Sequence, residues 1–403
     1  MVCQNENQKE NCNENPEYLH SQLITYIGNK RSLLDFIGDG VKIVQSRLNK
    51  EKLNCLDVFG GSGIISRYLK QYSNSIVVND LEEYSCVINR CYLANKSNLD
   101  LDKLNSIYRD LKKSINERLD NIENQRNSGM YAAPGFISQL YSPVDSENVK
   151  ESERCFYTTY NANYIDVARQ VIDENVPEEY RDFFIAPLLS EASIHANTAG
   201  IFKGFYKNSK TGIGQFGGNG KNALSRIKGN IELPFPVFSN YDCKFKVFNK
   251  DANSLVLSDE LYDDVFLDGE KEYDLAYFDP PYNQHPYGSN YFMLNLISTY
   301  KSPDVTKISK VSGIPKNWNR SSYNKKKLVA DVFFDLVKNV RAKYVLISFN
   351  SEGFIPKEYM IELLSQCGTV EVLESKYNAF RGSRNLSARE IHVKEYLFLL
   401  KKS

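Results

Sequence analysis

The sequence predicts an α/β protein built around a doubly wound, mostly parallel β-sheet that helices cover on both faces. The first observation is a set of short apolar runs, typical of buried strands, at 53–59, 75–79, 275–278 and 344–349. The second is the helical pattern of the segments 64–71 and 327–340, which lie between such runs. Strands that alternate with helices form parallel sheets. Near the end of the chain, 370–374 and 392–400 are expected to add an antiparallel pair at one edge of this sheet.

The alternation of strands and helices stops between the second and third of these strands. Helical patterns at 100–124, 161–173 and 178–196 are followed by a stretch rich in Gly, Asn and Lys at 207–222, which indicates a loop or hairpin. The simplest interpretation is a mainly helical domain at 96–245, inserted into a sheet domain made of 21–95 and 246–403. Residues 1–20, which are rich in Asn and Glu, are expected to form a disordered tail.

Composition restricts the class of protein. The chain of 403 residues has no run approaching the roughly 20 apolar residues of a membrane span and no apolar secretion signal at its start, so we expect a cytoplasmic protein. Its eight cysteines form no CxxC pair and only four histidines are present, which argues against a disulfide framework and against a metal site. We therefore expect reduced thiols, no bound metal and a monomer.

Charge is balanced overall but uneven along the chain. Fifty basic and fifty acidic residues cancel, which argues against a protein that simply coats nucleic acid. Between 201 and 233, a single acid is accompanied by six bases: Lys203, Lys207, Lys210, Lys221, Arg226 and Lys228. A second basic run contains Lys316, Arg320, Lys325, Lys326 and Lys327, and it surrounds Trp318. Each run can neutralise phosphates or can be a solvated face, and Trp318 can stack on DNA or pack internally.

The first predicted strand runs into a glycine-rich turn. Gly60, Gly61 and Gly63 precede the helix at 64–71, and glycine there lets the backbone approach a ligand at the carboxyl edge of the sheet. The next strand ends at Asp80, whose carboxylate can accept hydrogen bonds from both hydroxyls of a ribose. A tight turn followed by a helix cap is the alternative. The acid at the second strand end favours a nucleoside cofactor.

The strand at 275–278 delivers an acid, two prolines and an aromatic residue: Asp279, Pro280, Pro281 and Tyr282. The prolines fix the backbone, so the Asp279 carboxylate and the Pro280 carbonyl can each accept one N–H bond from an amine such as that of adenine. These bonds would pull the nitrogen towards tetrahedral geometry and aim its lone pair at a methyl donor. Tyr282 offers a face on which an extruded base can stack. A plain proline-rich loop is the alternative.

Three motifs resemble, in order, the signatures of the D12 class of DNA adenine methyltransferases, the group that includes Dam: TYIGNKR at 25–31, DVFGGSG at 57–63 and DPPY at 279–282. Their order is similar to the alpha arrangement, with cofactor loop, target-recognition insert and catalytic loop in succession. The resemblance implies a Rossmann-like fold, S-adenosylmethionine as cofactor, and methylation of the N6 amine of a flipped adenine in double-stranded DNA. It further implies the modification enzyme of a restriction-modification system, with a cognate endonuclease as its expected counterpart.

The resemblance also implies roles for single residues. Tyr26 and Lys30 would contact the methionine part of the cofactor, and Asp80 would hold its ribose. Within the motifs, Asp57, Phe59, Gly61, Gly63 and Asp279 would complete the cofactor pocket. Asp251 and Ala252, in the strand-like stretch 248–252, resemble the segment that meets the cofactor's adenine, and Tyr291 and Phe292 look like the family's aromatic contact to the cofactor. Compact Dam proteins have a shorter insert, so the family's DNA contacts cannot be transferred. On their positive charge alone, we predict that Arg320 and the six bases between 203 and 228 bind DNA.

Two other functions have to be weighed against this one. Methylation of an amino group of RNA or of a protein glutamine would use a similar site, but the glutamine-modifying relatives usually carry Asn where this chain has Asp279. The basic insert favours nucleic acid without separating DNA from RNA. A catalytically inactive DNA-binding module is disfavoured by the intact acid, prolines and tyrosine. The recognition sequence does not follow from the residues, because base readout depends on which side chains reach which groove edge.

Overall fold

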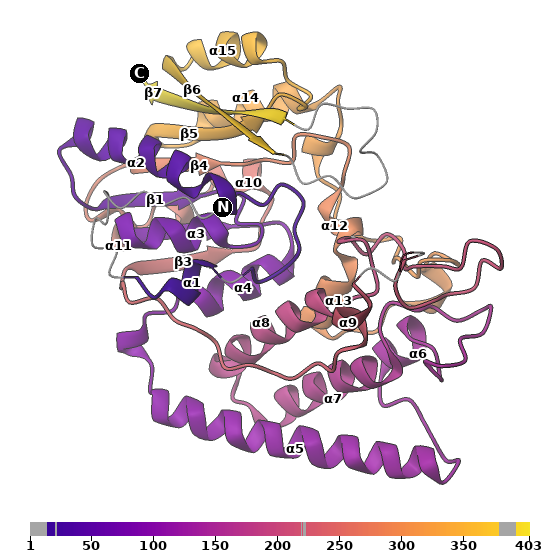
Figure 1. The fold of residues 1–403 in the computed structure, drawn as a ribbon. Helices are drawn as coiled ribbons and strands as arrows, with labels where there is room; N and C mark the ends of the chain where they lie inside the picture. The colour runs from indigo at the N-terminus through magenta and orange to yellow at the C-terminus, as the bar shows by residue number, and fades with distance from the viewer. Residues whose placement is uncertain (1–13, 21, 219, 221–222, 379–391) are drawn as a thin grey trace, which may run out of the picture.

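The protein is described by a computed structural model that covers residues 14–20, 22–218, 220, 223–378 and 392–403. Its centre is a seven-stranded sheet of order β3-β2-β1-β4-β5-β7-β6, in which only β7 runs antiparallel to its neighbours (Figure 1). The strands are β1 (Leu53–Asp57), β2 (Ser73–Asn79), β3 (Lys244–Phe248), β4 (Tyr273–Phe278), β5 (Ala342–Asn350), β6 (Gly368–Asn378) and β7 (His392–Lys402). The predicted doubly wound, mostly parallel sheet and its antiparallel edge pair are confirmed.

The central strands β1 and β4 are buried along their whole length because helices cover both faces of the sheet. One face packs against α2 (Leu34–Leu48) and α3 (Ile64–Leu69). The other face packs against α10 (Ala252–Val256), α11 (Asp264–Leu267), α14 (Val329–Asn339) and α15 (Lys357–Ser365). Asp57 lies opposite Tyr277, and Phe278 opposite Ile347, so the carboxyl ends of β1, β4 and β5 meet at one edge of the sheet. That edge carries the site described below.

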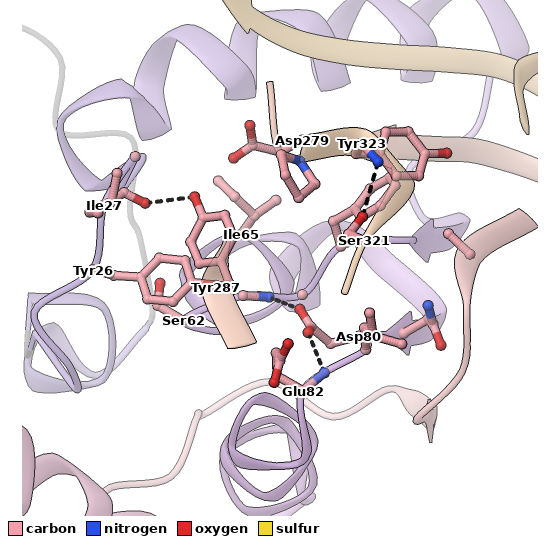
Figure 2. Close-up of a pocket in the computed structure, with 18 of the residues that line it drawn as sticks. Tyr26, Ile27, Ser62, Ile65, Asp80, Glu82, Asp279, Tyr287, Ser321 and Tyr323 are labelled. Atoms are coloured by element: carbon pink, nitrogen blue, oxygen red, sulfur yellow. Dashed lines mark hydrogen bonds between the residues drawn. The ribbon is translucent and has the colours of Figure 1, made fainter. Parts of the chain in front are cut away.

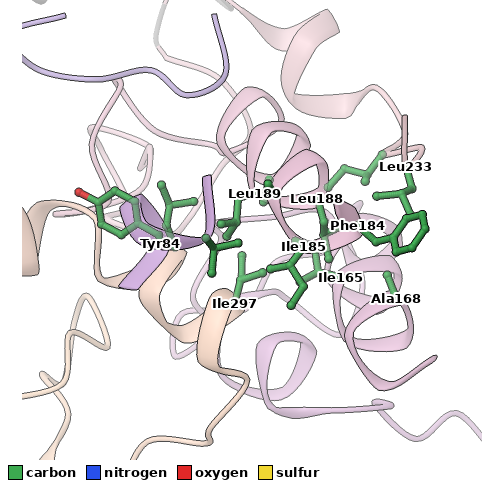
Figure 3. Packing of buried hydrophobic residues seen from close by; sticks show 14 of the residues in the cluster. Tyr84, Ile165, Ala168, Phe184, Ile185, Leu188, Leu189, Leu233 and Ile297 are labelled. Carbon is green, nitrogen blue, oxygen red and sulfur yellow. The ribbon is translucent and has the colours of Figure 1, made fainter. Parts of the chain in front are cut away.

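The chain between α4 (Glu83–Leu93) and β3 is mainly helical and lies to one side of the sheet (Figure 1). Its helices are α5 (Leu101–Asn127), α6 (Phe136–Tyr141), α7 (Thr159–Asn175), α8 (Glu178–Ile194) and α9 (Leu224–Lys228). Phe184 and Leu188 of α8 share one buried cluster with Tyr84 of α4 and with Ile297 of α13 (Phe292–Thr299) (Figure 3). The helical region is therefore joined to the sheet by continuous packing, and the domain boundaries at 96 and 245 stay a prediction.

Short helical segments complete the described chain. They are α1 (Pro16–His20), α12 (Tyr287–Asn290), and the 3-10 turns Arg31–Leu33, Lys70–Tyr72, Lys96–Asn98, Asp259–Tyr262, Val305–Lys307 and Ser322–Asn324. In the part of the chain that the structure describes, no helix is long and apolar enough to cross a membrane.

Two segments differ from the sequence-based expectation. The disordered tail was predicted to reach residue 20, but residues 16–20 form α1, because the Tyr18 ring is buried under the Arg67 guanidinium and its hydroxyl donates to the Tyr92 carbonyl. Residues 1–13 lie outside the described chain. The strand β3 has no counterpart among the predicted strands, because an edge strand with partly exposed side chains carries no continuous apolar run.

Candidate active site

A cavity of about 930 Å³, counted with its open mouth, lies at the carboxyl ends of β1, β2 and β4 (Figure 2). Six segments far apart in the sequence contribute to its wall: parts of 26–30, 59–65, 79–82, 250–252, 277–288 and 319–324. Ligands of open α/β sheets bind at this edge, because the loops that follow the strands are free to carry functional side chains there. The structure therefore brings the three motifs of the sequence to one place.

The glycine turn after β1 is closed by the acid at the end of β2. The Gly61 amide donates to Asp80 Oδ2 at 2.7 Å, and the Glu82 amide donates to Asp80 Oδ1 at 2.8 Å. Gly61 has a φ of 53°, and a Cβ there would lie 3.1 Å from the Tyr26 ring. Burial raises the pKa of the Asp80 carboxyl. Asp80 is therefore fixed in orientation, and each of its oxygens keeps an acceptor site beside the cavity that it lines.

Asp57 and Gly63 lie outside the wall of the cavity and support the turn instead. Asp57 accepts a hydrogen bond from Ser66 Oγ at 2.6 Å and one from the Phe59 amide at 3.3 Å. Burial raises the pKa of Asp57 to about 7. Gly63 begins α3 with a φ of 75°, in close contact with Asn89. Asp57 and Gly63 therefore shape the glycine turn without lining the cavity, and their contact with a cofactor stays a prediction.

The residues from Asp279 to Tyr282 follow β4 directly. The Asp279 side chain is 19% exposed and faces the cavity together with Pro281 and Tyr282, whereas Pro280 is buried beside them. The Tyr282 carbonyl accepts a hydrogen bond from the Phe354 amide at 2.9 Å, which fixes the end of the loop. Burial raises the pKa of Asp279 to about 7, although the neighbouring Lys30 ammonium lowers it. Asp279 can therefore change its protonation state near neutral pH.

Asp279 contacts a buried cluster of charged residues, Lys30 and Glu395, which did not follow from the sequence. Lys30 Nζ lies 3.3 Å from Asp279 Oδ1 and 2.6 Å from Glu395 Oε1, and Ser348 Oγ donates to the same Glu395 oxygen at 2.6 Å. The side chains of Lys30 and Glu395 are 3% and 1% exposed. Burial lowers the pKa of Lys30, but the carboxylates of Asp279 and Glu395 more than offset this and raise it well above its ordinary value. The Lys30 side chain therefore stays positively charged, and it is held in place by Glu395 of β7.

Three tyrosines form the aromatic wall. The three rings stack on one another: the Tyr26 centroid lies 5.0 Å from that of Tyr287 and 4.9 Å from that of Tyr291, and the last two are 5.9 Å apart. Tyr26 and Tyr287 line the cavity, whereas Tyr291 is fully buried behind them and its hydroxyl accepts the Ile27 amide. Phe292 points into the core of the helical region. Of the aromatic residues after the catalytic loop, Tyr287 lines the cavity whereas Tyr291 and Phe292 do not, because the chain turns through α12 between Tyr287 and Tyr291. The contact of Tyr291 or Phe292 with a cofactor stays a prediction.

The far end of the cavity combines aromatic and aliphatic surfaces. Phe59 meets Tyr323 edge-to-face at 5.2 Å, and Ala252 lies in the same wall. The Asp251 carboxylate accepts from the Ser254 amide at 3.0 Å and so caps α10. Phe59, Asp251 and Ala252 thus lie at the cavity as predicted from the motifs, but Tyr323, which comes from a distant loop, had no sequence signal.

Glu82 is a second buried acid of the wall that the sequence analysis did not single out. It accepts hydrogen bonds from the side-chain amides of Asn295 and Asn319, the latter at 3.2 Å. Burial raises the pKa of Glu82 to about 7. Glu82 thereby ties the cofactor-side loop after β2 to the segment that contains Trp318. Among the described residues there is no group of histidine, cysteine and acidic side chains that could hold a metal ion.

The basic residues of the helical region fall into two groups. Lys203, Lys207 and Lys210 are exposed, and none of them pairs with a described carboxylate. Lys203 lies near the catalytic loop, since burial and then the Lys203 charge lower the pKa of His285.

The other predicted bases of this region are engaged or cannot be placed. Arg226 is half-buried, and its guanidinium donates to the carbonyls of Ile194 and Ala196, so its predicted DNA contact is revised to a structural cap of α8. Lys228 pairs with Glu147 at 3.0 Å. Lys221 lies outside the described residues.

This arrangement is typical of an α/β enzyme whose ligand site lies at the carboxyl edge of its sheet, here with an acid-Pro-Pro-Tyr loop beside the cavity. Comparison with known proteins adds the family, since residues 26–363 match the D12 class of N6 adenine-specific DNA methyltransferases. The chain belongs to this family. Its methyl-accepting group is therefore the N6 amine of adenine in DNA, as the resemblance implied.

Three relatives in the comparison are Type II methyltransferases, and two of them match this chain over nearly their whole length. The chain is 30% identical over 380 residues to the Type II methyltransferase M.CviAII of Paramecium bursaria Chlorella virus 1, a match that covers 94% of this chain and 98% of the relative. It is 29% identical over 387 residues to the Type II methyltransferase M.NlaIII of Neisseria lactamica, covering 94% and 100%. The Type II methyltransferase M.FokI of Planomicrobium okeanokoites is 26% identical, and the match covers 94% of this chain but 52% of that protein.

Proposed function

We propose that the cavity binds S-adenosylmethionine and that Asp279, Pro280 and Tyr282 hold the target adenine beside it. The observation that carries the proposal is the convergence of two half-buried acids, Asp80 and Asp279, on one cavity from the ends of β2 and β4. The residues present fit the cofactor: Asp80 offers acceptors for two ribose hydroxyls, and Phe59, Ala252 and Tyr323 offer a slot for a planar base. Tyr26 and Lys30 form the opposite end, where the methionine part would lie.

When bound, S-adenosylmethionine supplies an electrophilic methyl group. The protein's part is to make the adenine amine a better nucleophile, because its lone pair is delocalised into the ring. The Asp279 carboxylate and the Pro280 carbonyl accept the two N–H bonds, and Tyr282 supports the ring of the extruded base. After transfer, the nitrogen carries one proton too many, and Asp279, whose pKa is raised to about 7, can accept it.

We further propose that the enzyme is the modification partner of a restriction endonuclease that recognises the same site. Support comes from the relatives, which are Type II methyltransferases and match this chain over nearly its whole length. We expect the enzyme to act as a monomer on double-stranded DNA in the cytoplasm. The exposed bases Lys203, Lys207 and Lys210 are the proposed phosphate contacts of the helical region, and Arg320 is proposed on the opposite side of the cavity.

Transfer of a labelled methyl group from S-adenosylmethionine tests the proposal. Purified protein is incubated with equal masses of duplex DNA, RNA and a mixed protein substrate, and with DNA alone for Asp279→Ala. The expected result is label in DNA only, and none with the variant. Label in RNA or protein, or equal label with Asp279→Ala, would contradict the proposal.

A further inference from the structure

The segment between α13 and α14, residues 300–328, is the most strongly charged stretch beside the cavity, and we call it the basic strap. It contains one acid, Asp304, and eight bases: Lys301, Lys307, Lys310, Lys316, Arg320, Lys325, Lys326 and Lys327. All eight side chains are exposed, and within the described chain only Lys307 pairs with a carboxylate, that of Asp304 at 3.2 Å. A net positive charge this dense is costly to maintain unless a polyanion neutralises it.

The strap is held against the protein by its backbone and its uncharged side chains. The Tyr141 hydroxyl donates to the Gly313 carbonyl at 2.9 Å, and the Arg154 guanidinium donates to the Ser309 and Lys310 carbonyls. At the other end, Asn319 Nδ2 donates to the Leu81 carbonyl at 3.0 Å. The strap therefore runs from the helical region to the cofactor-side loop, with its cations directed to solvent.

The strap also forms the rim of the cavity. Asn319, Ser321 and Tyr323 belong to the cavity wall, and Figure 2 labels Ser321 and Tyr323 there. The backbone of Asn319 packs so closely on Gly288 that a Cβ on Gly288 would lie 2.5 Å from the Asn319 carbonyl oxygen. Gly288 is the residue after Tyr287, in the turn that follows the catalytic loop. A strand of DNA that delivers a base to Asp279 has to pass this rim.

A second hollow adjoins the rim and carries the chain's single tryptophan. Trp318 and Asn317 line it together with Lys301 and Lys307, and it shares Gly288 and Asn319 with the main cavity. Trp318 is half-buried, and the Arg320 guanidinium lies 4.3 Å from its ring centroid. A flat indole beside exposed cations is a surface on which a nucleobase stacks while its phosphate is neutralised.

We propose that the basic strap is a second DNA-contacting surface, in which the exposed cations bind phosphates beside the target adenine and Trp318 lies against a nucleotide. The inference rests on the proposed function, because it takes duplex DNA as the substrate. The strap is distinct in sequence from the bases of the helical region, and it borders the cavity at Gly288. Its Asn324 donates to the carbonyls of Asn283 and His285, the histidine that Lys203 also approaches, so the strap and Lys203 lie beside the same loop.

Because Trp318 is the only tryptophan, the intrinsic fluorescence of the wild-type protein tests the inference directly. The protein is titrated with sheared duplex DNA that it methylates, while binding is followed independently by the anisotropy of a labelled fragment. The expected result is a change of tryptophan emission, and reduced quenching by acrylamide, that saturates with the anisotropy. Saturated binding with unchanged emission and unchanged quenching would overturn the inference.

Charge variants give a second, independent readout. The salt slope is the slope of the logarithm of the DNA-binding constant against the logarithm of the salt concentration. The double variant Lys325→Gln with Lys326→Gln should lower its magnitude by about two units. The variant Trp318→Ala should weaken binding about 5- to 150-fold. The matched control, Lys271→Gln with Lys338→Gln, removes two exposed lysines near the amino ends of β4 and β5, at the opposite edge of the sheet, and should leave the slope unchanged. Equal slopes for both pairs would overturn the inference while DNA methylation persists, whereas loss of all DNA methylation by the wild type would overturn the proposed function itself.

Discussion

The cavity at the edge of the sheet and the basic surface around it are built in opposite ways. In the cavity, the charged side chains are buried and tied to partners: Asp80 to two amides, Asp279 to Lys30, and Lys30 to Glu395. On the surface, Lys203, Lys207 and Lys210 are exposed and pair with no described carboxylate. The chemistry is therefore fixed by the topology of the sheet, whereas contacts to DNA depend on side chains that the fold leaves free. Changes in the two regions should consequently have different signatures.

The largest expected effect is that of Asp279→Ala on the methyl-transfer step. Single-turnover rates should fall by at least about 100- to 10,000-fold, because an N–H acceptor and a proton acceptor are lost together. Cofactor affinity should stay close to that of the wild type, since Asp80 and the glycine turn are unchanged. Asp279→Asn should retain at most a trace of activity. A variant with wild-type turnover would remove Asp279 from the mechanism.

The next effect concerns cofactor binding. Asp80→Ala should weaken S-adenosylmethionine binding by about 1–3 kcal/mol, because charge-assisted hydrogen bonds to ribose hydroxyls are lost. DNA affinity without cofactor should not change, which separates this variant from those of the surface. Calorimetry with Asp263→Ala, which removes the cap of α11 at an exposed position outside the cavity wall, serves as the comparison. Equal cofactor affinity for wild type and Asp80→Ala would make Asp80 a loop-closing residue alone.

The change of the single-turnover rate with pH should be smaller than the effects of the two variants above, and it should report on Asp279 and the charges beside it. Asp279 acts as a carboxylate, and its pKa is raised to about 7, so the single-turnover rate should fall as pH falls through that region. The Glu395 charge raises the pKa of Asp279, and Glu395→Gln removes it and frees Lys30 to pair with Asp279. Both changes lower the pKa of Asp279, so the fall in rate should move to lower pH.

Two further variants check this assignment. Ser348→Ala, which removes a hydrogen bond to Glu395, tests the same cluster by another route. Glu362→Gln, at an exposed position of α15, is the matched control and should keep the wild-type profile. Identical pH profiles for the wild type and Glu395→Gln would leave the cluster a purely structural feature.

The smallest effects are expected on the surface of the helical region. Neutralising Lys203, Lys207 or Lys210 should lower the salt slope of DNA binding by about one unit each, while a base-reading residue would cost about 1–3 kcal/mol at one position of the site. Arg226→Gln should instead destabilise the fold by about 1–3 kcal/mol, because the carbonyls of Ile194 and Ala196 lose their donor. Thermal unfolding and salt-dependent binding, measured on the same variants, distinguish the two classes.

The sequence was sufficient for features that depend on local pattern. Runs of apolar residues located six of the seven strands, and the residues that follow those strands, Gly61, Asp80 and Asp279, were found at the cavity. This works because the carboxyl ends of parallel strands necessarily share one edge. Phe59 and Ala252, by contrast, were singled out by the resemblance to the D12 class and not by the strand pattern.

Features that depend on long-range packing did not follow from the pattern. Glu395 meets Lys30 across 365 positions, and nothing near Glu395 in the sequence marks it as part of a site. Tyr287 replaces Tyr291 at the cavity because the short helix α12 rotates the chain between them. Arg226 has the charge of a DNA contact, but its burial against α8 gives it another partner. In each case the missing information was the identity of a neighbour distant in sequence.

The central claim, that the cavity methylates adenine while the surrounding basic surface holds DNA, is tested most directly by mapping modified bases. Unmethylated duplex DNA is treated with the wild type, with Asp279→Ala, and with the Lys203, Lys207 and Lys210 variants, then digested for mass spectrometry and sequenced. The account predicts N6-methyladenine at one sequence context for the wild type, none for Asp279→Ala, and the same modified base in salt-sensitive yield for the lysine variants. Methylation of a different base, or N6-methyladenine made by Asp279→Ala, would contradict it.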